Sequence, residues 1–329
     1  MADSILVMTT SCAPIYHRRP RTIPPTNYDV VVVGAGCAGL GAALVLGRCR
    51  RRVLVCDGGA PRNAPSPNVH AFLSRDGIRP QELLRISREQ LAPYTSVVIR
   101  PGRVTTLTVA DHGFTLKAES ESGRPATITT RKVLLATGVD DELPPLDGMR
   151  ELWGRGVLHC PYCHGWEVQD QALAVYGRGK PVTGLALLVS RWSPDVVVCT
   201  DGPGGLSTNA RQRLRAQGIG IREEPIARLQ GNRRGDLKCV VFQNGDELER
   251  QAIFVHPHQH QRGTLAEQLG CRLTSKGAVW VDKNLQTSIP GLYAAGDMTP
   301  GSQQALLAAA EGARVGILLN ERLTKEECS

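Results

Sequence analysis

Two cysteines separated by two residues stand near the middle of this 329-residue chain, in the stretch CPYCHG at 160–165. Cys160 and Cys163 can close a small disulfide, and such pairs exchange electrons readily when their surroundings stabilise one thiolate. His164 follows directly and can accept or supply a proton near neutral pH. These residue types at this spacing predict dithiol–disulfide chemistry. Two other interpretations stay open on these residues alone: half of a zinc site, or two unrelated core cysteines.

The elements before this stretch predict a nucleotide cofactor. A β-branched run at 28–33 indicates a strand that is buried on both faces, as in a parallel sheet. It leads into GAGCAG at 34–39, a small-residue helix at 40–47 and a second strand at 52–56. Asp57 ends that strand, where a carboxylate can accept hydrogen bonds from an adenosine ribose. This βαβ pattern is typical of a dinucleotide site.

The three glycines of GAGCAG have separate tasks in such a site. Gly34 allows the tight turn, Gly36 lets the backbone approach a pyrophosphate, and Gly39 lets the helix pack on the strand. The helix N-terminus then faces the phosphate charge.

Two later strand ends predict a second and a third approach to the cofactor. A buried strand at 132–135 ends in ATG at 136–138, and a short apolar strand ends in AAGD at 294–297. Asp297 can hydrogen-bond a ribityl hydroxyl, and the start of a helix expected at 303–323 can stabilise charge on the pyrimidine edge of a flavin. Together these turns favour FAD over NAD. The residues predicted to bind FAD are Gly34, Ala35, Gly36, Cys37, Ala38, Gly39, Asp57, Asn63, Val104, Ala136, Thr137, Gly138, Gly296, Asp297, Gln304 and Ala305.

A second βαβ pattern lies between these cofactor segments. It has strands at 172–176 and 196–199 and a glycine turn at 177–180, and it follows the cysteine pair. We expect an α/β fold with two Rossmann-like, three-layer ββα domains, the second inserted in the first. The expected parts are an N-terminal tail at 1–27, a discontinuous FAD-binding domain at 28–143 and 252–329, and an inserted domain that resembles an NADPH domain at 144–251.

Composition limits the other classes of function. The net charge of +8 comes from dispersed arginines without a recognition motif, so nucleic-acid binding is not expected. No run of 18 apolar residues predicts a membrane span. Ten cysteines in 329 residues are too few for a disulfide scaffold, and most of them are expected to be buried and free. That usage suits a reducing cytoplasm.

From residue 28 onward the sequence resembles the low-molecular-weight thioredoxin reductases. The motifs that carry the resemblance are GAGCAG (34–39), ATG (136–138), CPYC (160–163) and AAGD (294–297). It implies a flavin disulfide oxidoreductase, usually a homodimer through its FAD domain. By this resemblance, Cys163 lies against the flavin and Cys160 exchanges with the substrate.

The chain departs from that family at three places. Its second glycine turn carries Pro181, and Val182 replaces the small residue that close helix packing needs. After the next strand no arginine is placed to hold a 2′-phosphate, and Asp201 would repel one, so NADPH binding is not expected. His164 stands where the reductases carry an acid, and its imidazole can shuttle protons between thiols and flavin.

CPYCHG beside a degenerate second nucleotide site resembles a specialised branch of this family, the dithiol oxidases of natural-product pathways. Those enzymes install disulfides in gliotoxin, holomycin and romidepsin. The resemblance implies that electrons pass from a small-molecule dithiol through the cysteine pair and FAD to O₂, which gives H₂O₂. His164 would then deprotonate a substrate thiol, while Tyr162 and Trp166 are candidates to contact the substrate.

Two alternatives remain open. One is an NADPH-dependent reductase of thioredoxin or of a small disulfide, with the opposite direction of electron flow. The other is a flavin-binding redox sensor without turnover.

No metal site is predicted. Zinc at the cysteine pair needs two more ligands, and His159 and His164 are too close in sequence to complete a tetrahedron easily. The alternating His256, His258 and His260 fall in an expected loop, and no acid or cysteine near them completes a set. Cys328 lacks the neighbouring cysteine that a C-terminal redox shuttle would need.

Overall fold

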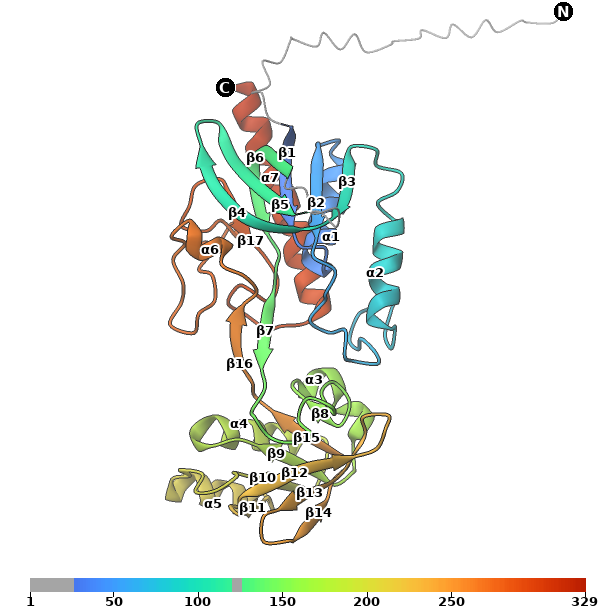
Figure 1. Ribbon diagram of the computed structural model, residues 1–329, viewed down its shortest axis with the longest axis vertical. Coiled ribbons are helices and arrows are strands. Elements are labelled where there is room, and N and C mark those ends of the chain that lie inside the picture. Colours follow the sequence, from blue (N-terminus) through green and yellow to red (C-terminus); the bar gives the residue numbers. More distant parts are fainter. Residues whose placement is uncertain (1–26, 120–125) are drawn as a thin grey trace, which may run out of the picture.

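The computed structural model describes residues 27–119 and 126–329, which form two sheet-based domains joined by a pair of strands (Figure 1). The predicted tail at 1–27 lies outside the described residues except for Asn27. Among the described residues, no helix is long and apolar enough to cross a membrane.

The outer domain is built on a seven-stranded sheet in the order β3-β2-β1-β6-β5-β4, with β17 also paired to β6. Strands β3, β2, β1, β6 and β17 run parallel, and β4 and β5 form an antiparallel ribbon. The strands are β1 (Tyr28–Val33), β2 (Val53–Asp57), β3 (Val97–Pro101), β4 (Arg103–Ala110), β5 (Gly113–Glu119), β6 (Ala126–Leu135) and β17 (Leu292–Ala294).

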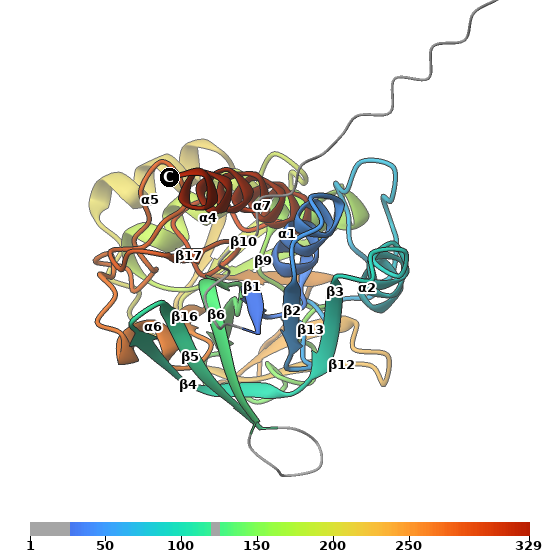
Figure 2. The same cartoon turned by 90° about the horizontal axis from the view of Figure 1, so that it is seen from above.

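Both faces of this sheet are covered, which is why its central strands are continuous apolar runs. Helices α1 (Cys37–Arg48) and α7 (Ala305–Cys328) lie together over one face (Figure 2), where Leu46 and Leu319 are fully buried. The β4–β5 ribbon covers the opposite face. Helix α2 (Pro80–Glu89) lies beyond α1, and the short α6 (Leu265–Gln268) contacts β4.

The inserted domain has a five-stranded parallel sheet in the order β11-β10-β9-β15-β8. Helices α4 and α5 cover one face and an antiparallel sheet β12-β13-β14 covers the other, which gives the expected three layers. The elements are β8 (Val157–Leu158), α3 (Pro161–His164), the 3₁₀ turn η1 (Trp166–Val168), β9 (Leu173–Tyr176), α4 (Gly179–Val189), β10 (Val196–Cys199), α5 (Thr208–Ala216), β11 (Gly220–Arg222), β12 (Ile226–Gly231), β13 (Leu237–Phe242), β14 (Glu247–Glu249) and β15 (Ala252–Val255). The predicted fold class is therefore confirmed.

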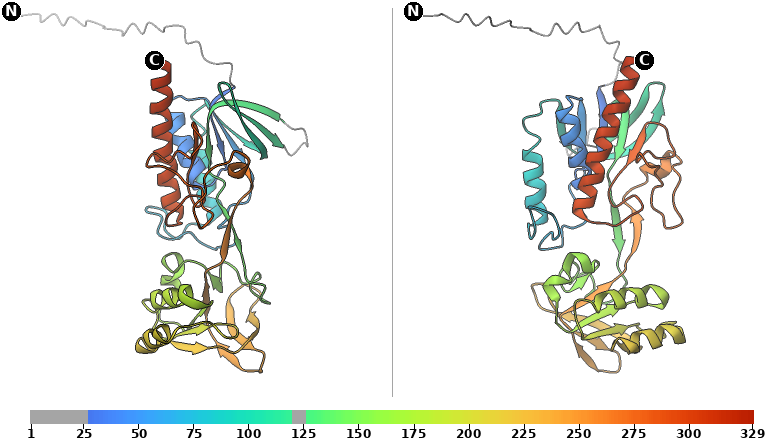
Figure 3. Two further views of the ribbon diagram at one scale, coloured as in Figure 1. Left: turned by 90° about the vertical axis from the view of Figure 1, so that its left-hand side faces the viewer. Right: turned by 180° about the vertical axis from the view of Figure 1, so that it is seen from behind.

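Two antiparallel strands, β7 (Val139–Glu142) and β16 (His258–Gln261), carry the chain between the domains (Figure 3). They correct two expectations. Residues 252–255 were assigned to the outer domain, whereas β15 is hydrogen-bonded to β9 and β8 in the sheet of the insert. Residues 258–260 were expected in a loop, whereas they are strand, because their backbone pairs with β7.

Candidate active site

The cysteine pair is held by one turn of helix at the carboxyl end of β8. Cys160 is the N-cap residue of α3 and is disulfide-bonded to Cys163, with their Cα atoms 5.2 Å apart. Pro161 occupies the first helical position, where its missing N–H costs no hydrogen bond. The amides of Cys163 and His164 both donate to the Cys160 carbonyl, at 3.1 and 3.2 Å. Local backbone structure alone therefore holds the two sulfurs within bonding reach.

One cavity of about 840 Å³ opens beside this pair and is lined by both domains. Cys160, Cys163 and His164 line it from the insert. From the outer domain it is lined by the turns that follow β1, β2, β6 and β17. A group bound along these turns would therefore share one space with the cysteines.

The first glycine turn is shaped for a dinucleotide. Gly34 has φ +114°, and a Cβ there would lie 2.2 Å from the Ala136 carbonyl oxygen. A Cβ on Gly39 would lie 1.9 Å from the Gly34 oxygen, so the helix could not pack against the strand. A Cβ on Gly36 would meet nothing within 4 Å, because Gly36 borders the open cavity. These are the three tasks expected for the glycines, and the cradle fits FAD.

The residues predicted to bind FAD fall into two groups. Gly39 packs α1 against β1 and does not line the cavity. All the others line it, namely Gly34, Ala35, Gly36, Cys37, Ala38, Asp57, Asn63, Val104, Ala136, Thr137, Gly138, Gly296, Asp297, Gln304 and Ala305. Helix α7 begins at Ala305, within the expected range, and its first turn borders the cavity.

Asp57 lies at the end of β2, as expected, but protein groups already hold its carboxylate. Oδ2 accepts from Nη2 of Arg88 at 2.7 Å, and Oδ1 accepts from the Gly59 amide at 2.9 Å. These contacts fix the direction of the carboxylate at the cavity wall, and each oxygen has a further lone pair for a ribose hydroxyl.

Arg62 is a buried cation at the domain junction that the sequence analysis missed. Its guanidinium is bonded through Nε and Nη2 to both carboxylate oxygens of Asp141 at 2.7 Å, and Nη1 donates to Asp297 at 2.8 Å. Nη2 also lies 3.3 Å from Nδ1 of His159. Burial lowers the pKa of Arg62, but the contacts with Asp141 and Asp297 outweigh burial and raise it. Arg62 stands in a proline-rich loop without periodicity. Only the fact that it is an arginine could have indicated an ion pair there.

His164 faces the same cavity and is uncharged at neutral pH. Burial, with a smaller repulsion from His70, lowers the pKa of His164 to about 4. Its Nε2 lies 3.4 Å from the hydroxyl of Ser66 in the outer domain. A neutral imidazole has a lone pair that can accept a thiol proton, but a pKa of about 4 makes it a weak base.

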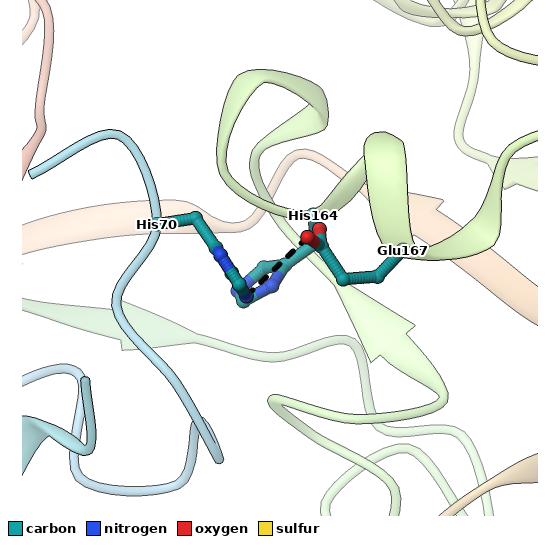
Figure 4. Close-up of side chains that lie close together, drawn as sticks. All are labelled: His70, His164 and Glu167. Atoms are coloured by element: carbon teal, nitrogen blue, oxygen red, sulfur yellow. Dashed lines mark ion pairs between the residues drawn. The ribbon is translucent and has the colours of Figure 1, made fainter. Parts of the chain in front are cut away.

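His70 meets two side chains of the stretch that carries the cysteine pair, His164 and Glu167 (Figure 4). His70 comes from the loop between β2 and α2, His164 from α3 and Glu167 from η1. His70 Nε2 lies 3.4 Å from Glu167 Oε1. Neither His70 nor Glu167 was predicted as a site residue, because neither belongs to a recognisable motif.

The second glycine turn is closed by its own loop. The amide of Gly179, the first residue of α4, donates to the Gly204 carbonyl at 2.7 Å. Arg178 donates from Nε to the Thr200 carbonyl at 3.0 Å and from Nη2 to the Asp201 carbonyl. No arginine was expected after β10, whereas Arg178 from the turn itself covers the carboxyl end of that strand. In a nucleotide site, that amide and that strand end face the pyrophosphate and the ribose.

The remaining candidates lie at other places. Tyr162 and Trp166 are 63% and 71% exposed, so both offer an apolar ring next to the cysteine pair. Cys328 lies at the end of α7 that points away from the insert (Figure 1).

His258 and His260 lie on the surface of β16. The expectation that no acid accompanies them is wrong, because Glu142 on β7 contacts His260 at 2.6 Å.

Most of the free cysteines are placed as the sequence analysis expected. Of the seven free cysteines among the described residues, four are buried, Cys37 is partly buried, and Cys49 and Cys328 are exposed. Cys12 lies outside the described residues.

Comparisons with known proteins agree with this fold. Residues 28–312 match the family model described as pyridine nucleotide-disulphide oxidoreductase. Thioredoxin reductase sirT from Leptosphaeria maculans is 30% identical, over 90% of this chain and 94% of that protein. The crystal structure of HlmI is 38% identical over 92% of this chain and 94% of that chain, with a TM-score of 0.85. An oxidoreductase from Agrobacterium tumefaciens is 30% identical over 91% and 99%, with a TM-score of 0.82.

Proposed function

This chain belongs to the pyridine nucleotide-disulphide oxidoreductase family, whose members bind FAD, and from that premise we propose that it is a dithiol oxidase. It forms an intramolecular disulfide in a small-molecule dithiol and uses O₂ as the electron acceptor. The overall reaction is balanced when one dithiol and one O₂ give one cyclic disulfide and one H₂O₂.

The closed second glycine turn is the observation that favours electron flow from a dithiol to O₂ over flow from NADPH to a disulfide. The first amide of α4 donates to Gly204, and Arg178 covers the carboxyl end of β10. NADPH would have to displace both contacts and then place its 2′-phosphate beside the Asp201 carboxylate. Without a hydride donor in the insert, the cysteine pair receives its electrons from a dithiol.

The chain's own groups perform the thiol exchange. A substrate thiolate attacks Sγ of Cys160, the Cys160–Cys163 bond breaks, and Cys163 leaves as a thiolate. The second substrate thiolate attacks the substrate sulfur of this mixed disulfide, which closes the cyclic product and releases Cys160. His164 accepts a thiol proton through its neutral imidazole. Bound FAD would take the electron pair from the reduced cysteines and deliver it to O₂.

A small, partly apolar substrate fits the surroundings of the pair. Tyr162 and Trp166 are exposed next to it. Several relatives are fungal proteins named thioredoxin reductase, with the names sirT, tcpT and aclT. We assign this chain a natural-product dithiol rather than a protein substrate, and we expect a homodimer through the outer domain.

An anaerobic titration of the purified flavoprotein distinguishes the oxidase from the reductase. We expect dithiothreitol to bleach the flavin absorbance and NADPH to leave it unchanged. On admission of air, one H₂O₂ should form for each dithiol oxidised. Rapid bleaching by NADPH would favour the reductase, and no O₂ uptake with any dithiol would favour a sensor without turnover.

A further inference from the structure

His70, His164 and Glu167 are arranged as three ligands of one metal ion could be. Their ligand atoms all lie within 4.8 Å of one another (Figure 4). His70 belongs to the outer domain, and the other two belong to the insert. Any group that binds all three therefore ties the two domains together beside the cysteine pair.

The distances suit a tetrahedral metal ion. Zn²⁺ binds imidazole nitrogen and carboxylate oxygen at about 2.0–2.2 Å, which places neighbouring ligand atoms of a tetrahedron about 3.3–3.6 Å apart. The 3.4 Å between His70 Nε2 and Glu167 Oε1 already equals such an edge. The two separations that involve His164 are at most 4.8 Å, so moving its ligand nitrogen by roughly one ångström would bring them towards this range. Two imidazoles and one carboxylate are a set that zinc uses in proteins, with a fourth position left for water.

A carboxylate behind His70 supplies a second, independent feature. Asp76 Oδ2 lies 3.6 Å from Nδ1 of His70, the nitrogen that faces away from Glu167. Oδ1 of Asp76 accepts from the Ala71 amide at 2.7 Å, which fixes the carboxylate. A carboxylate at this place can hydrogen-bond the ring after a small shift, and in metal sites such a bond fixes the tautomer and presents the other nitrogen to the metal.

We propose that His70, His164 and Glu167 form a Zn²⁺ site whose occupation inhibits thiol oxidation. The inhibition rests on the proposed function, because it requires His164 to be the proton acceptor. Zinc would occupy the imidazole lone pair that otherwise takes the thiol proton, and it would also join the loop of His70 to the turn that carries the cysteines. Zinc binding itself needs neither the oxidase activity nor a substrate.

The chain contains a matched control. Glu142, His258 and His260 form a second histidine–carboxylate group, which is exposed on β7 and β16. The double variant His258→Ala/His260→Ala removes that group and leaves the proposed site intact. His70→Ala removes a ligand of the proposed site without altering the CPYCHG stretch.

The binding test is calorimetry with ZnCl₂ on the oxidised holoenzyme after treatment with a chelator, so that Cys160 and Cys163 remain in their disulfide. In the His258→Ala/His260→Ala background we expect one Zn²⁺ per chain. His70→Ala should weaken its binding at least about tenfold, and Asp76→Asn about tenfold. Co²⁺ should give the visible bands of a tetrahedral site in this background and not in His70→Ala. Equal affinity with and without His70, or no binding in this background, would overturn the site.

The inhibition test is anaerobic flavin reduction by dithiothreitol at a free Zn²⁺ concentration fixed by a zinc buffer. Each variant is compared with its own rate without zinc. Wild type and His258→Ala/His260→Ala should slow as zinc binds, and His70→Ala should not. Binding without slowing would overturn the inhibition alone. Zinc binding measured by calorimetry would persist even if O₂ were not the acceptor. Failure of the oxidase proposal can therefore be told apart from failure of the zinc site.

Discussion

The two βαβ units of this molecule begin with the same plan and differ at the turn. In the first, β1–Gly34–α1–β2, a cavity reaches the turn and Gly36 borders open space. In the second, β9–Gly177–α4–β10, the first amide of the helix donates a hydrogen bond to the Gly204 carbonyl, and Arg178 covers the carboxyl end of β10. The two units therefore share a fold while their turns differ, because core packing and the shape of the turn depend on different residues.

The largest effect is expected from substituting the cysteine pair, which lies between the two units in the sequence. Cys160→Ser and Cys163→Ser should each lower dithiol oxidation at least about a thousandfold, because thiol exchange needs both sulfurs. Both variants should keep the yellow flavin, since neither sulfur belongs to the glycine cradle. Oxygen uptake with dithiothreitol is the measurement, and the exposed Cys49→Ser variant is the control. Full turnover in either cysteine variant would contradict the mechanism.

The second prediction concerns the proton acceptor beside the pair. His164→Gln should slow flavin reduction by a dithiol by about 10²-fold, the usual contribution of a positioned base. Because the pKa of His164 is lowered to about 4, the wild-type imidazole stays neutral down to about that pH. The wild-type rate should therefore lose the contribution of His164 only as the pH falls through about 4. Stopped-flow rates across pH test this, and an unchanged rate in the variant would exclude His164 as the base.

The third prediction compares the two turns directly. Gly36→Val places a side chain in the open cavity without backbone strain, so FAD affinity should fall about 10²-fold while the chain still folds. Arg178→Ala in the second turn should leave the flavin content and the dithiol oxidation unchanged. Flavin absorbance after gel filtration measures the first effect. If Arg178→Ala lost its flavin, or if Gly36→Val kept it, the contrast between the two units would be wrong.

The smallest expected effect is on stability. Burial lowers the pKa of His164 from 6.5 to about 4, so the unfolded chain takes up a proton before the folded chain does. The stabilisation that comes from keeping His164 neutral is complete above pH 6.5 and is lost as the pH falls towards 4. Its loss between pH 7 and pH 5 should lower the free energy of unfolding by about 2 kcal/mol. Urea unfolding at both pH values measures it, and the difference should be smaller by that amount in His164→Gln.

The sequence predicted the glycine cradle and the order of the domains because both depend on local patterns. Gly34, Gly36 and Gly39 each have a task within one strand–turn–helix, so their spacing alone identified them. The contacts of Arg62 and His70 could not be predicted in this way, since they depend on loops without periodicity that meet the insert across the domain junction. The same holds for Arg178, where the sequence analysis looked for a cation after β10 and the fold supplied one from before α4.

The boundary of the insert was misplaced for a related physical reason. Residues 252–255 are a short apolar run that would suit either sheet, and only the pairing with β9 and β8 assigns it. The histidines at 258–260 were expected in a loop because they come just after the predicted strand at 252–255. They instead form an exposed strand whose partner, β7, lies far away in the sequence.

The paired strands β7 and β16 have a consequence for how such a protein can change over evolutionary time. The chain leaves the outer domain and returns to it at adjacent points, and the insert contributes no strand to the seven-stranded sheet. The insert is therefore a module that is attached through the paired strands β7 and β16. If it were removed, one hairpin turn could join these two strands. The glycine turn of the flavin cradle itself lies outside the module. Under the proposed function, the turn of the insert can therefore differ from the flavin cradle although both halves keep the same kind of fold.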